Sequence, residues 1–370
     1  MSIIDILRDW TNRVFGHIEG LVLLGLITIC LVVLLTVGFY LAPVIAGLVV
    51  AFALHGVVKQ LILWRIPRLV AIGGVLVLFI GAIIALFIVI LPLVWAQLQN
   101  LVTQIPQLVS ALQAILTEFA INYPQLVPDA FLESLNVTAQ AQFTNLGGQI
   151  VQQIVQQLPN LVWFLIFLLL VPISLFFFLK DHKQMVEYLR RVLPKNRPLL
   201  DEVGRETIAQ MGSYIRGKLL EILIVGGVCY IVFSLFGLQF AALLSLLVGL
   251  SVIIPFVGAA VVTVPVVIVA LVQFGWTWDF FFVVIAYAII QVLDGNVLVP
   301  LLFTKANDLH PVVIIVAVLA FGGLWGIWGV FFAIPLATFI RAVINAWPTK
   351  ISVDGDDPDS PPQPQSVSAE

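Results

Sequence analysis

The sequence predicts an all-α protein that crosses a membrane several times. Of its 370 residues, 61% are hydrophobic and only 10% are charged, whereas about a quarter of the residues in a typical soluble domain are charged. Several apolar runs reach the roughly 18 residues that a helix needs to cross a hydrocarbon core of about 30 Å. The alternating segments of about ten residues that are typical of a transmembrane barrel do not occur.

Eight apolar tracts predict about eight transmembrane helices. Their bounds are about 20–38, 41–58, 69–92, 159–179, 219–237, 241–257, 258–275 and 279–300. A ninth apolar block, at about 311–340, is interrupted by Gly322, Gly323, Gly326 and Gly329. Because glycine permits sharp backbone bends, this block predicts a broken or re-entrant helical hairpin rather than one span.

The basic residues orient these spans. Nine of the seventeen Lys and Arg residues fall within 180–218, and none lies between Arg68 and Lys180. The positive-inside rule therefore places 180–218 in the cytoplasm and 93–158 outside. The short basic loop near Arg65 is then cytoplasmic too, which makes 20–58 a hairpin. Both termini are expected in the cytoplasm, and the protein in the plasma (inner) membrane.

The resulting division has seven parts. They are a cytoplasmic N-terminus (1–19), three spans (20–92), an extracytoplasmic helical segment (93–158), a fourth span (159–179), a basic cytoplasmic helical linker (180–218), a C-terminal transmembrane bundle with the hairpin (219–347) and a disordered tail (348–370). The tail, with DGDDPDSPPQPQ, cannot bury a core.

The external segment contains amphipathic helices. Apolar residues recur every three or four positions from Gln97 to Phe119, and the same stripe returns over 149–158. These helices are expected to pack together or to lie on the membrane surface. The basic linker 180–218 interleaves acids with its bases and has few aromatic residues, which favours a face toward lipid headgroups over a nucleic-acid site.

Enzymatic chemistry has no support in the residue pattern. The four histidines are scattered at positions 17, 55, 182 and 310, and the two cysteines, Cys30 and Cys229, lie in separate apolar tracts. No catalytic set, metal-ligand spacing or phosphate-binding loop can be assembled from them. We therefore expect no enzyme activity, cofactor, metal or nucleic-acid partner.

Backbone disruption inside the apolar tracts marks two candidate hinges. Pro255 is followed by Gly258 and, ten residues on, by Pro265. A proline frees backbone carbonyls, and membrane proteins tolerate this inside protein or beside a wet cavity, as at transporter substrate sites. The second hinge runs from the four glycines above to Pro335. For both hinges, a tight turn or close helix packing is the alternative interpretation.

A polar stretch at the end of the eighth span is the third candidate. It contains Asp294, Asn296, Pro300, His310 and Pro311. An ionisable residue inside a membrane tract is a functional candidate by default, so this stretch is predicted to be an inner gate or hinge of a solute pathway. Glu221, three residues after Lys218, is interpreted instead as a snorkelling residue at a helix start.

The order of these motifs resembles the autoinducer-2 exporter family of permease-M-like membrane proteins. The matching pieces include Leu179-Lys180-Asp181, Tyr214-Ile215-Arg216-Gly217-Lys218, Ile254-Pro255-Phe256-Val257-Gly258, His310-Pro311 and the Gly322–Pro335 segment. His55 stands where the family often has a proline. The resemblance implies a transport protein of about eight spans with a large external segment, and homo-oligomeric assembly. It associates members with autoinducer-2 export and some with sodium/proton exchange.

Three functions follow from these observations. The leading hypothesis is a secondary transporter that exports a small polar solute, such as an autoinducer-2-like signal or metabolite, with protons or sodium as coupling ions. One alternative is a sodium/proton antiporter with Asp294 as its carboxylate, although a cation site usually needs several convergent oxygens. The other is a membrane scaffold that binds a partner through the external helices. Membrane lipid surrounds the protein in each case.

Overall fold

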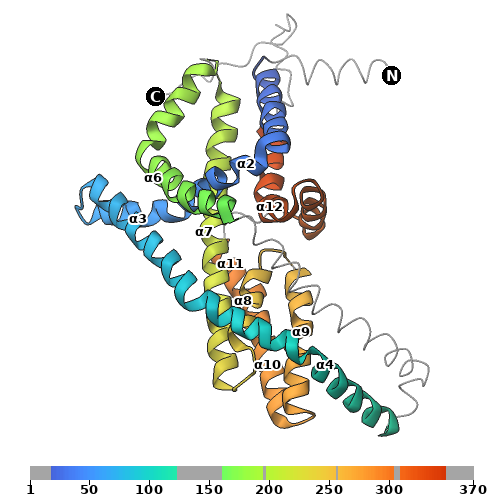
Figure 1. The fold of residues 1–370 in the computed structure, drawn as a ribbon. Coiled ribbons are helices and arrows are strands. Elements are labelled where there is room, and N and C mark those ends of the chain that lie inside the picture. The colour runs from blue at the N-terminus through green and yellow to red at the C-terminus, as the bar shows by residue number, and fades with distance from the viewer. Residues whose placement is uncertain (1–17, 123–160, 195–196, 256, 304–308, 347–370) are drawn as a thin grey trace, which may run out of the picture.

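The computed structural model describes residues 18–122, 161–194, 197–255, 257–303 and 309–346 (Figure 1). Within these ranges every element is helical, and seven segments are long and apolar enough to cross a membrane: Tyr40–Leu63, Arg68–Ile115, Trp163–Arg191, Pro198–Leu235, Val257–Phe274, Trp278–Leu302 and Trp328–Asn345. The predicted all-α polytopic fold is confirmed. The predicted amphipathic stretch 149–158 and the tail 348–370 lie outside the described residues.

The first helix, α2 (Ile18–Leu63), corrects one prediction. It runs through 20–58 as one helix, so the hairpin predicted there is wrong. Pro43 lies inside this helix with its side chain fully buried, because a packed membrane helix can accommodate proline when neighbouring groups shield the freed backbone. At Gly47 the helix lies so close to α6 that a Cβ would come within 2.6 Å of the Ser174 side chain.

The next span continues directly into the predicted external helix. α3 (Arg68–Ala85), the π-helical turn η1 (Leu86–Ile90) and α4 (Leu91–Asn122) follow one another without a break. The helix predicted from Gln97 is confirmed, and Gln97 Oε1 accepts a 2.9 Å hydrogen bond from the Leu243 backbone N–H. Val94, Leu98 and Leu101 pack into the core of the C-terminal helices. One face of α4 is therefore covered by the rest of the protein.

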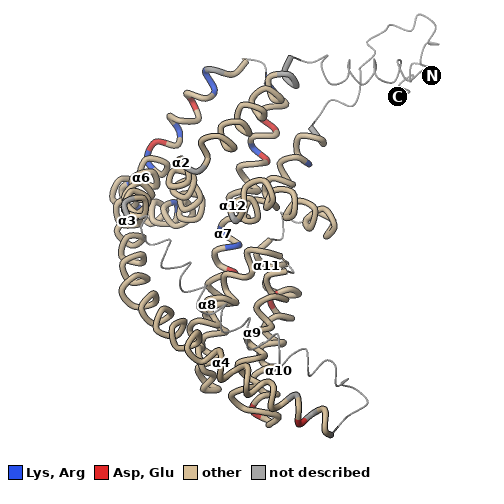
Figure 2. Tube along the Cα trace, turned by 45° about the vertical axis from the view of Figure 1, so that its right-hand side comes forward, with Lys and Arg blue, Asp and Glu red and all other residues tan. Residues whose placement is uncertain are grey.

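Two long helices contain the predicted basic linker. α6 (Leu161–Val192) extends beyond its apolar part, and α7 (Pro198–Leu235) begins well before its own. Figure 2 shows charged residues along α6 and the first half of α7, whereas α8 and α9 are almost free of them. The predicted boundary at 218 falls inside α7, where a continuous helix carries the chain from charged to apolar surroundings.

The C-terminal helices form the largest core. The second half of α7 packs against α8 (Ala241–Ser251), α9 (Val257–Phe274) and α10 (Trp278–Leu293) around buried residues such as Phe233, Leu244 and Val266. η3 (Asp294–Leu298) and α11 (Val299–Leu302) then continue α10. Pro300 lacks a backbone N–H and its ring crowds the preceding turn, which accounts for a π-helical turn directly before it.

The last helix, α12 (Pro311–Ala346), is broken at Gly326, whose φ of 60° and ψ of −139° are not helical. Its two halves fold back on each other. Ala317 from the first half clusters with Ala333 and Ala337 from the second, and Gly329 lies directly against the Phe321 carbonyl. The broken helical hairpin predicted from the glycines is confirmed.

Candidate functional site

A polar cavity of about 420 Å³ lies where α7, the α8–α9 turn, the α10–η3 junction and α12 meet. Its polar lining residues are Tyr214, Lys218, Glu221, Gln291 and Asp294. Cavities of this size fall within the roughly 300–1,000 Å³ of small-molecule sites. The cavity brings together residues that lie up to 120 positions apart in the sequence, from Tyr214 to Ile334.

A buried ion pair forms one wall of the cavity. Lys218 Nζ donates to Glu221 Oε2 over 2.8 Å, and the two side chains are only 5% and 3% exposed. The same ammonium donates to the Val252 carbonyl over 2.7 Å and lies 5.5 Å from the centroid of the Phe303 ring. Helical spacing of three residues places both side chains on one face of α7. The ammonium is thus satisfied on several sides despite its burial.

The α8–α9 turn supplies the carbonyl that Lys218 binds. α8 ends at Ser251, and the chain turns through Pro255 before α9 begins. The Val252 carbonyl therefore falls outside any helix, while the Ile254 carbonyl accepts the Gly258 N–H over 2.9 Å. Gly258 lies directly against the Ser251 carbonyl, where a Cβ would collide with the backbone. This close approach holds the start of α9 against the end of α8.

Asp294 carries the least satisfied group in the cavity. It stands at the junction of α10 and η3, and π-helical turns are frequent at functional sites. Among the described residues, its Oδ1 is buried and has no hydrogen-bond partner. Lys218 and Glu221 are both close enough to interact with it electrostatically. With all three groups ionised, one negative charge in the cavity lining stays uncompensated.

A chain of hydrogen bonds fixes the side chain of Gln291, which lines the cavity together with Asp294. Gln291 Nε2 donates to the Tyr287 hydroxyl over 2.7 Å, and that hydroxyl lies 3.1 Å from Thr263 Oγ1. Thr263 uses its own proton to bond the Ala259 carbonyl over 2.7 Å. A hydroxyl has a single proton, so Tyr287 must be the donor to Thr263. The chain ties α10 to α9 beside the cavity.

Aromatic and aliphatic side chains form the rest of the wall. The Tyr214 hydroxyl donates to the Phe331 carbonyl over 3.1 Å, and its ring centroid lies 5.8 Å from that of Phe303. Ile314 and Ile334, one from each half of α12, also line the cavity. The site therefore combines a few fixed polar groups with an apolar surround, as small-molecule sites generally do.

Only some of the gate and hinge residues predicted from the sequence line the polar cavity. Asp294 and Pro255 line the cavity. Asn296 is exposed and donates to the Val292 carbonyl one turn before it. Pro300 is exposed and lies in the first turn of α11, just after the π-helical turn. His310 is exposed and accepts the Val312 N–H at the start of α12, with Pro311 as the first helical residue.

The remaining hinge residues belong to helices around the site. Pro265 and Pro335 lie inside α9 and the second half of α12. Gly322 and Gly329 lie where the two halves of α12 meet, since each would bring a Cβ into contact with the other half, whereas Gly323 has open space beside it. None of these residues lines the polar cavity.

Sequence reasoning missed the ion pair. The interpretation of Glu221 as a snorkelling residue is wrong, because its side chain is buried against Lys218. α7 begins at Pro198, so the pair lies more than five turns inside a helix rather than at its start. The available signal was the Lys218–Glu221 spacing beside a long apolar run. No group of three or more potential metal ligands is found in the described part of the chain.

Apolar spans that enclose a polar cavity beside a broken helix are the architecture of a membrane transport protein. The chain belongs to the AI-2E transporter family, whose family model matches residues 21–349. This agrees with the resemblance seen in the motifs. Transport is a property of the family, whereas the solute and the direction are not fixed by it.

Named relatives cover nearly the whole chain. PerM of Escherichia coli (strain K12), which carries the name of a permease, is 41% identical over 353 residues, 93% of this chain and 98% of PerM. YrrI of Bacillus subtilis (strain 168), named as a transport protein, is 28% identical over 86% of this chain and 94% of its own length. TqsA of Escherichia coli (strain K12), named an AI-2 transport protein, is 22% identical over 88% of this chain and 91% of TqsA.

Proposed function

We propose that the protein is a secondary transporter that exports a small polar solute through the cavity between α7, α10 and α12. The observation that carries the proposal is the buried Asp294 Oδ1, which has no partner among the described residues although it lies beside a buried ion pair in a cavity of about 420 Å³. A buried polar group without a partner costs free energy. A bound solute would offset that cost by donating a hydrogen bond.

The lining supports recognition of a hydroxyl-rich or similarly polar molecule. Asp294 can accept hydrogen bonds, and Gln291 presents an amide whose position is fixed by Tyr287. The Tyr214 and Phe303 rings supply an apolar face against which a compact ring can pack. An autoinducer-2-like signal or a metabolite of that size fits this chemistry, and the name of TqsA supports the same class.

Coupling to protons or sodium is a second candidate with its own observation. From the sequence, Asp294 lacked the second carboxylate that a cation site usually requires. Glu221 now supplies one, and the lining carries one more negative than positive group when all three are ionised. A proton or a sodium ion at Asp294 would balance the cavity, because buried charge is strongly disfavoured unless it is compensated.

The test is transport by purified protein in proteoliposomes. A panel of labelled small polar solutes, including a furanone-type signal, is measured with and without an imposed proton or sodium gradient. We expect Asp294→Asn to lower the rate by at least about tenfold, because a lost charge-assisted hydrogen bond is worth roughly 1.5–3 kcal/mol. Unchanged transport in Asp294→Asn would refute the role of this cavity.

Asp279→Asn is the matched control. Asp279 lies on the same span but is exposed and outside the cavity, so its loss should leave transport near that of the unmodified protein. A rate that depends on the ion gradient in the unmodified protein and loses that dependence in Asp294→Asn supports coupling. Cation exchange with no solute movement would replace export with the antiporter alternative.

A further inference from the structure

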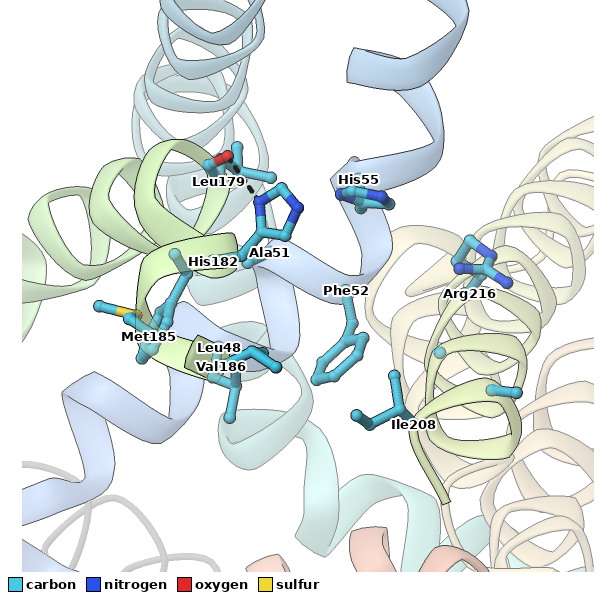
Figure 3. Close-up of a pocket in the computed structure, with 13 residues that line it drawn as sticks. Leu48, Ala51, Phe52, His55, Leu179, His182, Met185, Val186, Ile208 and Arg216 are labelled. Atoms are coloured by element: carbon cyan, nitrogen blue, oxygen red, sulfur yellow. Dashed lines mark hydrogen bonds between the residues drawn. The ribbon is translucent and has the colours of Figure 1, made fainter. Parts of the chain in front are cut away.

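A second cavity, of about 400 Å³, lies where α2 passes between α6 and α7. Figure 3 shows its arrangement: His55 from α2 and His182 from α6 lie side by side, and Arg216 lines the cavity from α7 on the other side of His55. The two imidazole centroids are 5.6 Å apart. The polar cavity described above shares none of these residues.

The charged and titratable side chains that line this cavity are all basic. None of its lining residues is acidic, and Arg216 has no ion-pair partner within the described ranges. Arg216 Nη2 donates a long hydrogen bond of 3.5 Å to Ser213 Oγ. Lys59 and Arg68 also lie close enough to His55 to interact with it electrostatically. The polar side chains of the lining are thus Arg216, His55 and His182, with no carboxylate among them.

Arg68 fixes how His182 presents its ring. Arg68 Nη2 donates to the carbonyls of Leu179 and Lys180 over 3.2 and 2.9 Å and lies 3.1 Å from His182 Nδ1. Both protons of Nη2 are used by these two carbonyls, and His182 Nδ1 also lies 3.3 Å from the Leu179 carbonyl (Figure 3). In its protonated form the ring donates from both nitrogens, so that His182 Nε2–H is available to an anion. An arginine and imidazole donors together suit phosphate or carboxylate oxygens.

The rest of the lining is apolar and open. It includes Leu48, Phe52, Met185, Val186 and Ile208. Met185, Val186 and Ile208 are exposed although they are large hydrophobic residues, and all three helices contain candidate spans. The mouth of this cavity therefore faces the surroundings of a membrane protein, where acyl chains are available to cover it.

We propose that this cavity binds an anionic phospholipid, with its phosphate between Arg216, His55 and His182 and an acyl chain against the apolar lining. Basic pockets between membrane helices are suited to anionic lipid headgroups. The anion supplies the charge that the lining lacks, and the chain covers side chains that are otherwise exposed. This site is independent of the transport proposal, because it neither shares residues with the polar cavity nor requires flux.

The experiment uses the full chain in nanodiscs that contain a phosphatidylglycerol with a photoactivatable acyl chain, compared with the matched phosphatidylcholine. Crosslinks are mapped by mass spectrometry. We expect the anionic probe to label segments 48–55, 182–186 and 208–212 at least about tenfold more than the zwitterionic probe, as charge-assisted binding implies. Equal labelling by both probes, or labelling only elsewhere, overturns the proposal.

Variants separate charge from shape. Arg216→Gln and His55→Leu should each lower labelling severalfold, whereas Arg65→Gln, at an exposed position outside the lining, should not. Ala209→Trp, at an exposed lining position, should block labelling by filling the cavity without removing a charge. Each variant is checked by its melting temperature and elution volume, and His55→Leu stands in if Arg216→Gln does not fold.

Competition identifies the occupant. An excess of unlabelled phosphatidylglycerol should suppress the crosslinks, while inorganic phosphate and oleate should not. Suppression by oleate at equal concentration would make this a fatty-acid site, and suppression by inorganic phosphate would make it a simple anion site. Crosslinked peptides from a second copy of the chain in these segments would make it a subunit interface. Each of these results overturns the phospholipid assignment.

Discussion

At the scale of single residues, the Lys218–Glu221 pair is the most consequential contact in the protein. Burying two charges is expensive, and their attraction repays the cost only when the remaining polar atoms are also satisfied. Here the Val252 carbonyl and the Phe303 ring complete the surroundings of the ammonium. Removing Lys218 would leave Glu221 as a buried carboxylate with no cation to balance it, which is far worse than having neither charge.

A double-mutant cycle measures this asymmetry. Lys218→Met alone should lower the free energy of unfolding by roughly 3–5 kcal/mol, and the double variant Lys218→Met/Glu221→Gln should recover most of that loss. The measurement is reversible unfolding in mixed micelles by chemical denaturant. If the double variant were as unstable as Lys218→Met, the charge left behind would not be the cause.

An exposed pair on α6 provides the control for that cycle. Arg191 Nη2 and Glu187 Oε1 are 2.7 Å apart, with side chains 69% and 63% exposed. Surface ion pairs contribute about 0–1 kcal/mol. The same cycle with Arg191→Met and Glu187→Gln should therefore change the free energy of unfolding little in any combination.

The sequence identified a polar residue of the cavity only where that residue interrupts an apolar run. Asp294 stood out because it interrupts an apolar run, and the structure places it in the polar cavity. Lys218 and Glu221 were hidden because they follow a charged stretch, so they resembled the edge of the membrane. Only the three-dimensional path of α7 carries them inward, and no local pattern encodes that path.

At the scale of elements, the break in α12 depends on one backbone conformation. Gly326 adopts a φ of 60° and a ψ of −139°, and an added Cβ would meet no neighbouring atom. The demand for glycine is therefore conformational rather than a matter of space. Residues with a side chain reach this region only at a cost on the order of 1–3 kcal/mol.

Gly326→Ala should consequently destabilise the protein by about that amount. Gly323→Ala is the matched control, because Gly323 is helical and also has open space beside it. Alanine there should be neutral or stabilising by up to about 1 kcal/mol. Thermal unfolding of the two purified variants makes the comparison. Equal melting temperatures would show that the break does not require glycine at 326.

The break predicted in the block 311–340 and the hairpin predicted at 20–58 differ in outcome for a physical reason. The glycines of α12 permit a backbone conformation that other residues avoid, and the chain uses it. A turn between the apolar tracts 20–38 and 41–58 was also expected, yet α2 stays helical through both, with Pro43 fully buried inside it. Whether proline breaks a membrane helix depends on packing, which one sequence does not reveal.

At the scale of the whole molecule, one end of the protein carries most of the charged residues of the described helices, and the other end consists of apolar helices. The charged parts of α6 and α7 lie at one end in both views, and α8–α10 lie at the other with α4 alongside them (Figures 1 and 2). The positive-inside rule puts the charged end in the cytoplasm. The turn between α6 and α7 and the end of α4 should then face opposite sides of the membrane.

Cysteine labelling tests this orientation. Glu118 on α4 and Glu202 on α7 are both exposed, so each is replaced by cysteine in a Cys30→Ser/Cys229→Ala background. In intact spheroplasts, a membrane-impermeant maleimide should label Glu118→Cys and spare Glu202→Cys. Permeabilised cells should show both labelled. Labelling of Glu202→Cys alone in intact cells would invert the topology.

Because α12 folds back on itself, both of its halves reach the polar cavity. Ile314 comes before the break and Ile334 after it, yet both touch the polar cavity. Both halves of α12, which are joined at the break at Gly326, therefore contribute to the wall of the cavity. We expect a change of the Gly326 backbone to alter the distance between the two halves and, with it, the space beside Asp294. The volume open to a solute is then expected to depend on a residue that does not itself line the cavity.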